Sequence, residues 1–308
     1  MKLELFRRVI ILATVSVGFG AIAQEPPTEL PVKSQSPTVS VPFLTQDGHG
    51  HALRLVTPAD LSISDNGKPP QSIVAIRNAR ELPLRLGVLI DTSNSERDSA
   101  LYIPGVHAAG DFLNQVLNGP EDRAFLETFD TVPKASRFMK RDEALNFKIN
   151  LNPGGASALS DAIYLACNDR MEGDPIQPAR RVLIILSDGG DNISDVEQDK
   201  AIAAAQQART VIFVVSTSGN ARDDLDSRRL ELFADKTGGL AFRHLNLRDI
   251  PEVFSTIREQ IENMYAVTYV PSDLVRMGQY RSIELKAKSD KKLKLRAPKG
   301  YYVNAELK

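Results

Sequence analysis

Three apolar runs constrain the fold of this 308-residue chain more than any other feature. They cover residues 84–90, 182–186 and 211–215, and Val, Ile and Leu dominate each of them. Runs of this length without polar alternation predict strands that are buried on both faces. Because helical patterns lie between the runs, we predict an α/β fold: a Rossmann-like, mostly parallel sheet flanked by helices.

The remaining elements of this α/β body, residues 83–264, follow from local periodicity. Helical spacing of apolar residues predicts helices at residues 101–117, 157–168, 195–209, 225–236 and 249–263. Two shorter apolar segments, at residues 124–129 and 240–244, predict further strands between the helices. Strands and helices therefore alternate along this part of the chain.

The segments on either side of this body have a β pattern. In residues 38–82, Val39, Val41 and Phe43 alternate with polar residues, residues 61–63 and 72–76 indicate strands, and Asn66-Gly67 predicts a hairpin turn. In residues 265–308 we predict strands at 265–270, 281–288 and 293–297, the last two joined by a tight turn at Asp290-Lys291. Each segment is small for independent folding, so we predict that the two pack together as a β-sandwich-like domain.

The N-terminus has the composition of an export signal. Residues 1–23 contain a basic start (Lys2, Arg7, Arg8) and an apolar run too short to span a membrane, followed by Ala21-Ile22-Ala23. We predict a signal peptide cleaved before Gln24, then a Pro-rich flexible linker at residues 24–37. The mature chain would be periplasmic or secreted, without a transmembrane span; an uncleaved membrane anchor is the alternative.

Composition excludes several classes of protein. The chain has 38 Lys and Arg against 39 Asp and Glu, and this balance argues against a nucleic-acid binder with a basic surface. Its single cysteine, Cys167, excludes an intrachain disulfide and cysteine-ligated zinc or iron–sulfur sites. Since Cys167 follows an apolar stretch, we predict that it is a buried small hydrophobe.

Three polar clusters fall where strands of the predicted sheet end, or just before a helix begins. Asp91, Ser93 and Ser95 follow the first apolar run, Ser157 precedes a predicted helix, and Asp188 follows the second run. Ligands of open parallel sheets bind at the carboxyl ends of the strands. Carboxylate and hydroxyl oxygens suit Mg²⁺, Mn²⁺ or Ca²⁺ rather than zinc or copper. These five residues are our predicted metal ligands.

The same residues resemble the metal-ion-dependent adhesion site of von Willebrand factor A (vWA) domains. The matching motifs are Asp91-x-Ser93-x-Ser95, a Gly-Gly-x-Ser157-Ala-Leu element and Leu-Ser-Asp188-Gly. The resemblance implies that the hydroxyls ligate Mg²⁺ (or Mn²⁺ or Ca²⁺), and that the two aspartates support it directly or through water. This chain has Ser157 where the family usually has threonine, and one additional residue, Ala156, after the glycines. Serine keeps the hydroxyl.

The flanking segments carry a second resemblance. Asp65-Asn-Gly-Lys-Pro before the body, and Tyr265-Ala-Val-Thr-Tyr and Lys299-Gly-Tyr-Tyr after it, are similar to the exported VWFA-related proteins of Acidobacteria. The resemblance implies a binding or adhesion protein, not an enzyme, whose metal engages a carboxylate on a protein partner. A metal-independent structural module of the cell envelope is the alternative, and an A domain that has lost its metal would fit it.

Enzymatic alternatives find little support in the sequence. A phosphatase of the haloacid-dehalogenase type needs an aspartate two residues after Asp91, where Ser93 stands. No Gly-rich fingerprint for a dinucleotide follows Ile90, and no G-x-S-x-G motif of a hydrolase occurs. The pair His49 and His51 lies in a predicted turn and is interpreted as solvated loop.

Overall fold

A computed structural model describes residues 38–52, 57–148, 150–172, 178–219, 224–273, 276, 278–288 and 293–303. The predicted signal peptide, the linker and the turn at Asp290-Lys291 lie outside these ranges. Within the ranges, no helix combines the length and the apolar character that crossing a bilayer requires.

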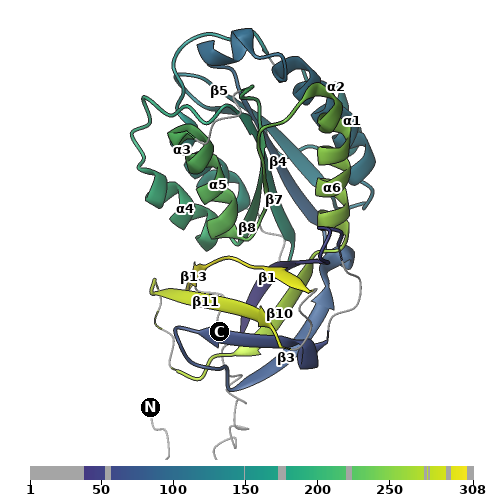
Figure 1. The fold of residues 1–308 in the computed structure, drawn as a ribbon, viewed down its shortest axis with the longest axis vertical. Coiled ribbons are helices and arrows are strands. Elements are labelled where there is room, and N and C mark those ends of the chain that lie inside the picture. The colour runs from purple at the N-terminus through teal and green to yellow at the C-terminus, as the bar shows by residue number, and fades with distance from the viewer. Residues whose placement is uncertain are drawn as a thin grey trace, which may run out of the picture. The chain divides into compact units, whose positions relative to one another are not determined.

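The α/β body is built on a six-stranded sheet with strand order β6-β5-β4-β7-β8-β9 (Figure 1). Its strands are β4 (Leu84–Asp91), β5 (Arg123–Phe129), β6 (Lys134–Ala135), β7 (Arg180–Ser187), β8 (Thr210–Ser216) and β9 (Ala241–Phe242). All neighbouring pairs are parallel except β5 and β6. The predicted fold class, a mostly parallel sheet flanked by helices, is therefore confirmed.

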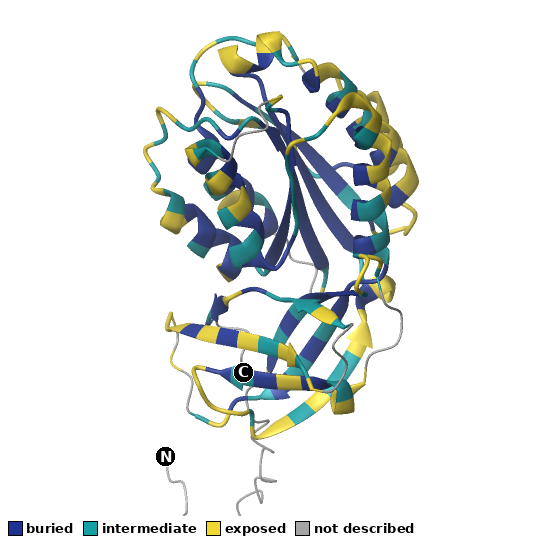
Figure 2. Ribbon diagram, viewed as in Figure 1, coloured by how far each residue is buried: buried dark blue, intermediate teal, exposed yellow. Residues whose placement is uncertain are grey.

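Helices cover both faces of this sheet (Figure 1). One face packs against α1 (Tyr102–Val116), α2 (Arg141–Asn146) and α6 (Ile250–Glu262), and the other against α3 (Leu159–Leu165), α4 (Gln198–Gln207) and α5 (Leu225–Thr237). Neighbouring residues of β4 face opposite helical layers: Val88 lies in the first apolar cluster and Leu89 in the second. Every residue of β4, β7 and β8 is buried, as Figure 2 shows for the central strands. The apolar runs are thus the double-sided core strands that their sequence predicts.

Two elements of the body escaped prediction, and the helices predicted at residues 157–168 and 195–209 have different bounds, the second being α4, Gln198–Gln207. β6 and α2 have two and six residues, too few to produce a recognisable period. The helix predicted at residues 157–168 begins at Leu159 and continues beyond Leu165 as a π-helical segment, Ala166–Met171.

The flanking segments form two further sheets around a shared apolar core. The first has the order β12-β1-β10-β3 and the second β13-β11-β2. Their strands are β1 (Val39–Gln46), β2 (Leu61–Asp65), β3 (Ser72–Asn78), β10 (Tyr265–Val270), β11 (Tyr280–Ala287), β12 (Lys294–Arg296) and β13 (Gly300–Tyr302). β1 pairs with β10 in antiparallel register, with Val41 opposite Val267. Strands from the beginning and the end of the chain therefore share sheets.

The strand pairing predicted at Asn66-Gly67 is wrong, although the turn itself forms. Asn66 and Gly67 adopt φ values of 51° and 81°, and Asp65 and Lys68 bond to each other across the turn. The ladder stops there because Pro69 and Pro70 follow, and proline has no N–H to donate. Instead, β2 pairs with β11, whereas β3 pairs with β10 in the other sheet.

The hairpin predicted from the two strands near the C-terminus is also wrong. β11 pairs with β13 through residues 280–282 and with β2 through residues 283–287, and no pairing of β11 with β12 occurs among the described residues. β12 pairs instead with the end of β1 in the first sheet, where Leu295 lies opposite Thr45.

Candidate metal site

The loop after β4 presents oxygen atoms from the sheet edge toward the surface. Asp91, the last residue of β4, is fully buried, and its Oδ1 accepts a hydrogen bond from the Ser93 N–H at 2.9 Å. The hydroxyls of Ser93 and Ser95 lie 3.1 Å apart; Ser93 is buried and Ser95 is exposed. A short 3₁₀ turn, η3 (Asn94–Asp98), begins within this loop. The three predicted ligands therefore extend from the buried carboxylate of Asp91 to the exposed residue Ser95.

Ser157 lies in the loop before α3 and faces the same point. Its Oγ is 3.4 Å from Asp91 Oδ2 and donates to the carbonyl of Gly190 at 2.7 Å. Asn192 holds the backbone of Ser157 from both sides. The Asn192 Oδ1 accepts from the Ser157 N–H, and the Asn192 N–H donates to the Ser157 carbonyl, both at 3.0 Å. The position of Ser157 is thus set by the loop that carries Asp188.

Asp188 follows β7 at a sharp turn. Its Oδ1 accepts from the Gly190 N–H at 2.9 Å. Gly189 has a φ of 94°, and a Cβ placed on it would lie 2.5 Å from the carbonyl oxygen of Asp226. This position therefore requires glycine for both its conformation and its space. Just before the turn, Ser187 Oγ donates to Asp91 Oδ2 at 2.7 Å and so connects β7 to β4.

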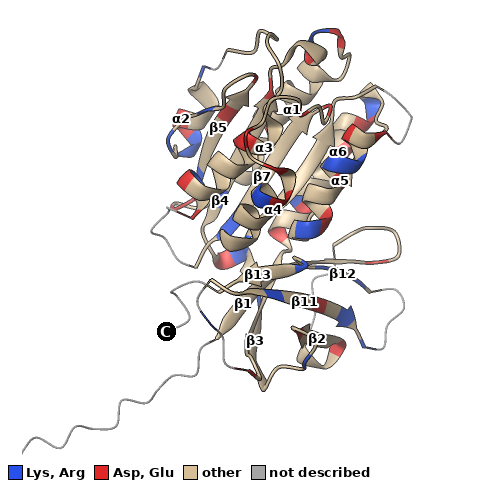
Figure 3. Ribbon diagram, turned by 90° about the vertical axis from the view of Figure 1, so that its left-hand side faces the viewer, with Lys and Arg blue, Asp and Glu red and all other residues tan. Residues whose placement is uncertain are grey.

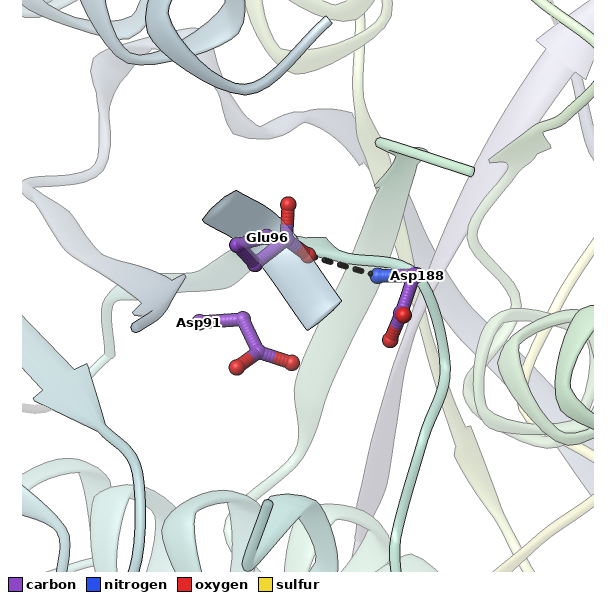
Figure 4. Close-up of side chains that lie close together, drawn as sticks. All are labelled: Asp91, Glu96 and Asp188. Carbon is purple, nitrogen blue, oxygen red and sulfur yellow. Dashed lines mark hydrogen bonds between the residues drawn. The ribbon is translucent and has the colours of Figure 1, made fainter. Parts of the chain in front are cut away.

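A third carboxylate, that of Glu96, joins the site from η3. Glu96 is 1% exposed, and its Oε1 accepts from the Asp188 N–H at 3.0 Å and from Thr217 Oγ1 at 2.6 Å. Carboxylate oxygens of Asp91, Glu96 and Asp188 all lie within 4.8 Å of one another. Figure 4 shows the three side chains converging, with the bond from the Asp188 N–H to Glu96 drawn as a dashed line.

Burial and mutual repulsion perturb two of these acids. Burial raises the pKa of Asp91 to about 6, although hydrogen bonds from Ser93 and Ser187 oppose the rise. Burial raises the pKa of Glu96 to about 8, and the nearby charge of Asp91 adds to the effect. Acidic residues are visible in Figure 3 along the loops beside α3 and β7. The ionised forms of these acids are therefore disfavoured in a poorly solvated place, and a cation there would stabilise them.

The donor set fits a hard divalent cation. Carboxylates, here those of Asp91, Glu96 and Asp188, and serine hydroxyls are the oxygen ligands that Mg²⁺, Mn²⁺ and Ca²⁺ prefer. Glu96 Oε2 is buried and has no hydrogen-bond partner in the described part of the chain. An acceptor left in this state costs free energy unless something positive satisfies it. The acidic cluster is thus compatible with metal binding.

The structure brings all five predicted residues to one edge of the sheet. Whether Asp91, Ser93, Ser95, Ser157 and Asp188 ligate a metal remains a prediction. Sequence reasoning assigned no role to Glu96 or Ser187, and it placed Asn192 near Asp188 without its bonds to Ser157. Ser187 could have been found, because it ends an apolar run next to Asp188. Glu96 carried no such signal, because an acidic residue in a polar loop normally faces water.

No family model matches the chain, and no curated protein matches it. Solved structures similar to it include von Willebrand factor A proteins. A von Willebrand factor type A protein from Catenulispora acidiphila is 12% identical with a TM-score of 0.47, over 89% of this chain and 76% of that one. Proximal thread matrix protein 1 from the mussel byssus, with a zinc-occupied MIDAS motif, is 14% identical with a TM-score of 0.49, over 65% and 50%.

A third similar structure is an aerotolerance-related membrane protein from Bacteroides fragilis. It is 14% identical with a TM-score of 0.42, over 58% of this chain and 98% of that one. All three TM-scores lie below 0.5.

Proposed function

We propose that this is an exported binding protein that holds a divalent cation at the edge of its six-stranded sheet and engages an acidic group on a protein partner. The observation that carries the proposal is the convergence of three carboxylates with three serine hydroxyls at that edge. The family resemblance assigns Ser93, Ser95 and Ser157 as hydroxyl ligands. It assigns Asp91 and Asp188 as supports that act directly or through water.

The cation, Mg²⁺ or alternatively Mn²⁺ or Ca²⁺, supplies a positive charge that can accept a carboxylate from another molecule. The burial of the ligand residues determines which side of the cation would face solvent. Asp91 is fully buried and Ser95 is exposed, so the outer side of the ligand set faces solvent. A partner's carboxylate would approach from this side.

Exposed apolar side chains near the site support a protein as the partner. Val132, Ile193 and Leu225 are 58%, 40% and 77% exposed, respectively. The Ile193 N–H donates to the Ser157 carbonyl at 3.3 Å. Val132 follows Thr131, whose hydroxyl accepts a hydrogen bond from the Ala156 N–H. Leu225 precedes Asp226, whose backbone lies against Gly189. Apolar side chains around a charged centre provide surface that a protein partner can cover.

We also propose that the protein is not an enzyme. Within the described residues, the hydrogen-bond partners of the Asp91 carboxylate are Ser93, Ser157 and Ser187, and none of them is a histidine, cysteine or lysine that would serve as a nucleophile or activate a serine. The hydroxyls of Ser157 and Ser187 donate to acceptors within the site, which suits ligands and supports better than nucleophiles.

A metal-independent envelope module is the second candidate. The observation in its favour is that hydrogen bonds from Ser93 and Ser187 to the Asp91 carboxylate connect these loops directly. In that case the loops would be held by hydrogen bonds alone, and a partner would bind elsewhere on the domain.

Isothermal titration of the whole chain with Mg²⁺, Mn²⁺ and Ca²⁺ tests the primary proposal. We expect one ion per chain, and loss of binding in Asp91→Asn, which keeps the shape of the side chain but removes its charge. Absence of binding by the wild type with all three ions would exclude the metal proposal. Partner recovery from envelope fractions that EDTA leaves unchanged would favour the metal-independent module.

A further inference from the structure

The geometry points to Glu96 as a third acidic group of the metal site, and we propose that it makes the site prefer Ca²⁺ over Mg²⁺. The inference rests on the proposed function. It concerns a residue that lies outside the motifs matched above, immediately after Ser95.

Glu96 is directed inward from a turn whose other residues face solvent. It is 1% exposed, whereas Asn94, Arg97 and Asp98 of the same 3₁₀ turn are exposed. A carboxylate oxygen of Glu96 lies within 4.8 Å of those of Asp91 and Asp188. The side chain therefore belongs spatially to the site and not to the surface.

Hydrogen bonding between loops does not account for an acidic residue at this position. The Glu96 Oε1 accepts both bonds, from the Asp188 N–H and from the Thr217 hydroxyl. A glutamine oxygen could accept the same two bonds without burying a charge. The second oxygen, Oε2, is buried without a partner. In Figure 4 the bonded oxygen of Glu96 is the one directed toward Asp188, and a cation among the three carboxylates would stabilise their ionised forms.

The number of carboxylates decides between the two ions. Mg²⁺ requires near-octahedral geometry, keeps several waters and is usually bound through one or two carboxylates. Ca²⁺ accepts six to eight oxygen ligands in flexible geometry, and carboxylates can bind it with both oxygens. Asp91 and Asp188 alone would suit Mg²⁺. A third carboxylate from Glu96 adds both ligand oxygens and negative charge, which favours the larger ion.

The chain provides a matched control in Glu127. This glutamate lies on β5, is also fully buried, and both of its carboxylate oxygens lack a hydrogen-bond partner among the described residues. It does not belong to the group formed by Asp91, Glu96 and Asp188. Replacing Glu127 by glutamine therefore removes a buried carboxylate without touching the proposed site.

The test is calorimetric titration of the whole wild-type chain, Glu96→Gln and Glu127→Gln with Ca²⁺ and with Mg²⁺ separately. Thermal unfolding of each variant without metal serves as the measure of folding. We expect the wild type and Glu127→Gln to bind Ca²⁺ more tightly than Mg²⁺. In Glu96→Gln we expect Ca²⁺ affinity to fall by about tenfold or more and Mg²⁺ affinity to fall less. If Glu96→Gln does not fold, Glu96→Asp withdraws the carboxylate by one methylene, and the Ca²⁺ preference should fall in it as well.

Three results would have distinct meanings. A wild type that binds no divalent ion overturns the proposed function together with this inference. A wild type that binds metal but prefers Mg²⁺ overturns the Ca²⁺ assignment alone. A preference for Ca²⁺ that is unchanged in folded Glu96→Gln, while Asp91→Asn abolishes binding, shows that Glu96 has only a structural role.

Discussion

Asp65 and Arg281 form a buried ion pair, with Arg281 Nε donating to Asp65 Oδ1 at 2.7 Å, although 216 residues separate them in the sequence. The other oxygen of Asp65 accepts hydrogen bonds from the hydroxyls of Tyr269 and Tyr301, each at 3.0 Å. One carboxylate on β2 therefore binds side chains from β10, β11 and β13. It joins the first flanking segment to the last at the core of the two smaller sheets.

Removing this carboxylate should destabilise the fold without involving the metal site. We expect Asp65→Ala to lower the free energy of unfolding by about 3–5 kcal/mol, because it leaves the Arg281 charge buried without its partner. Urea denaturation measures the change. Lys68→Ala removes an ion pair with Asp273 in which Lys68 is largely exposed, and should cost less than about 1 kcal/mol. Equal effects of the two variants would contradict the prediction.

Gly189 should resist substitution by any residue with a side chain. A Cβ would lie 2.5 Å from the backbone oxygen of Asp226, and the φ of 94° is unfavourable for alanine. We expect Gly189→Ala to lower the melting temperature and to weaken metal binding, because the turn that carries Asp188 must shift. Gly219→Ala is the comparison, since a Cβ on Gly219 meets no atom of the described residues within 4 Å. Similar melting temperatures for the two variants would argue against the proposed constraint.

The hydroxyl of Ser157, and not its size, should determine metal affinity. We expect Ser157→Ala to weaken divalent-ion binding by about tenfold or more, since it removes a proposed ligand that also bonds to Gly190. Ser157→Thr keeps the hydroxyl and should retain binding. Calorimetric titration of both variants measures the difference. Full affinity in the alanine variant would exclude Ser157 from the ligand set.

Glu127 should make stability depend on pH. Burial raises its pKa from 4.5 to about 8, an effect that Arg170 opposes and Asp169 reinforces. The folded state then holds a proton that the unfolded state releases above pH 4.5. The free energy of unfolding should therefore fall as pH rises from about 4.5 to about 8. Glu127→Gln cannot release that proton, so we expect it to be more stable than the wild type at pH 8.

This pH effect is measured by denaturation in EDTA across the range, which removes any contribution of bound metal. The pKa values of Asp91 and Glu96 are also raised, so these residues also lower the free energy of unfolding as pH rises. They do so equally in the wild type and in Glu127→Gln. The difference between wild type and variant isolates Glu127. A difference that stays constant from pH 5 to pH 8 would contradict the assignment.

Much of the fold could be predicted because its signals are local. The strands β4, β7 and β8 consist mainly of apolar residues, which predicts burial on both faces of the sheet. The helices between them show a regular apolar period. The positions of Asp91, Ser157 and Asp188 at one sheet edge follow from this alternation, since parallel strands end on the same side. Strand pairing in the flanking sheets was harder, because Pro69 and Pro70 stop a ladder that the Asn66-Gly67 turn begins.

The sequence by itself determined the α/β architecture and the edge where polar ligands gather, because both depend on residues close together in the chain. Only the tertiary structure decided that Glu96 belongs to that edge. Its hydrogen bond to Thr217 spans 121 residues, and its contact with the Asp188 N–H spans 92. A glutamate in a polar loop has no local reason to turn inward. It does so here because β7 and β8 place an N–H and a hydroxyl where its carboxylate can accept both.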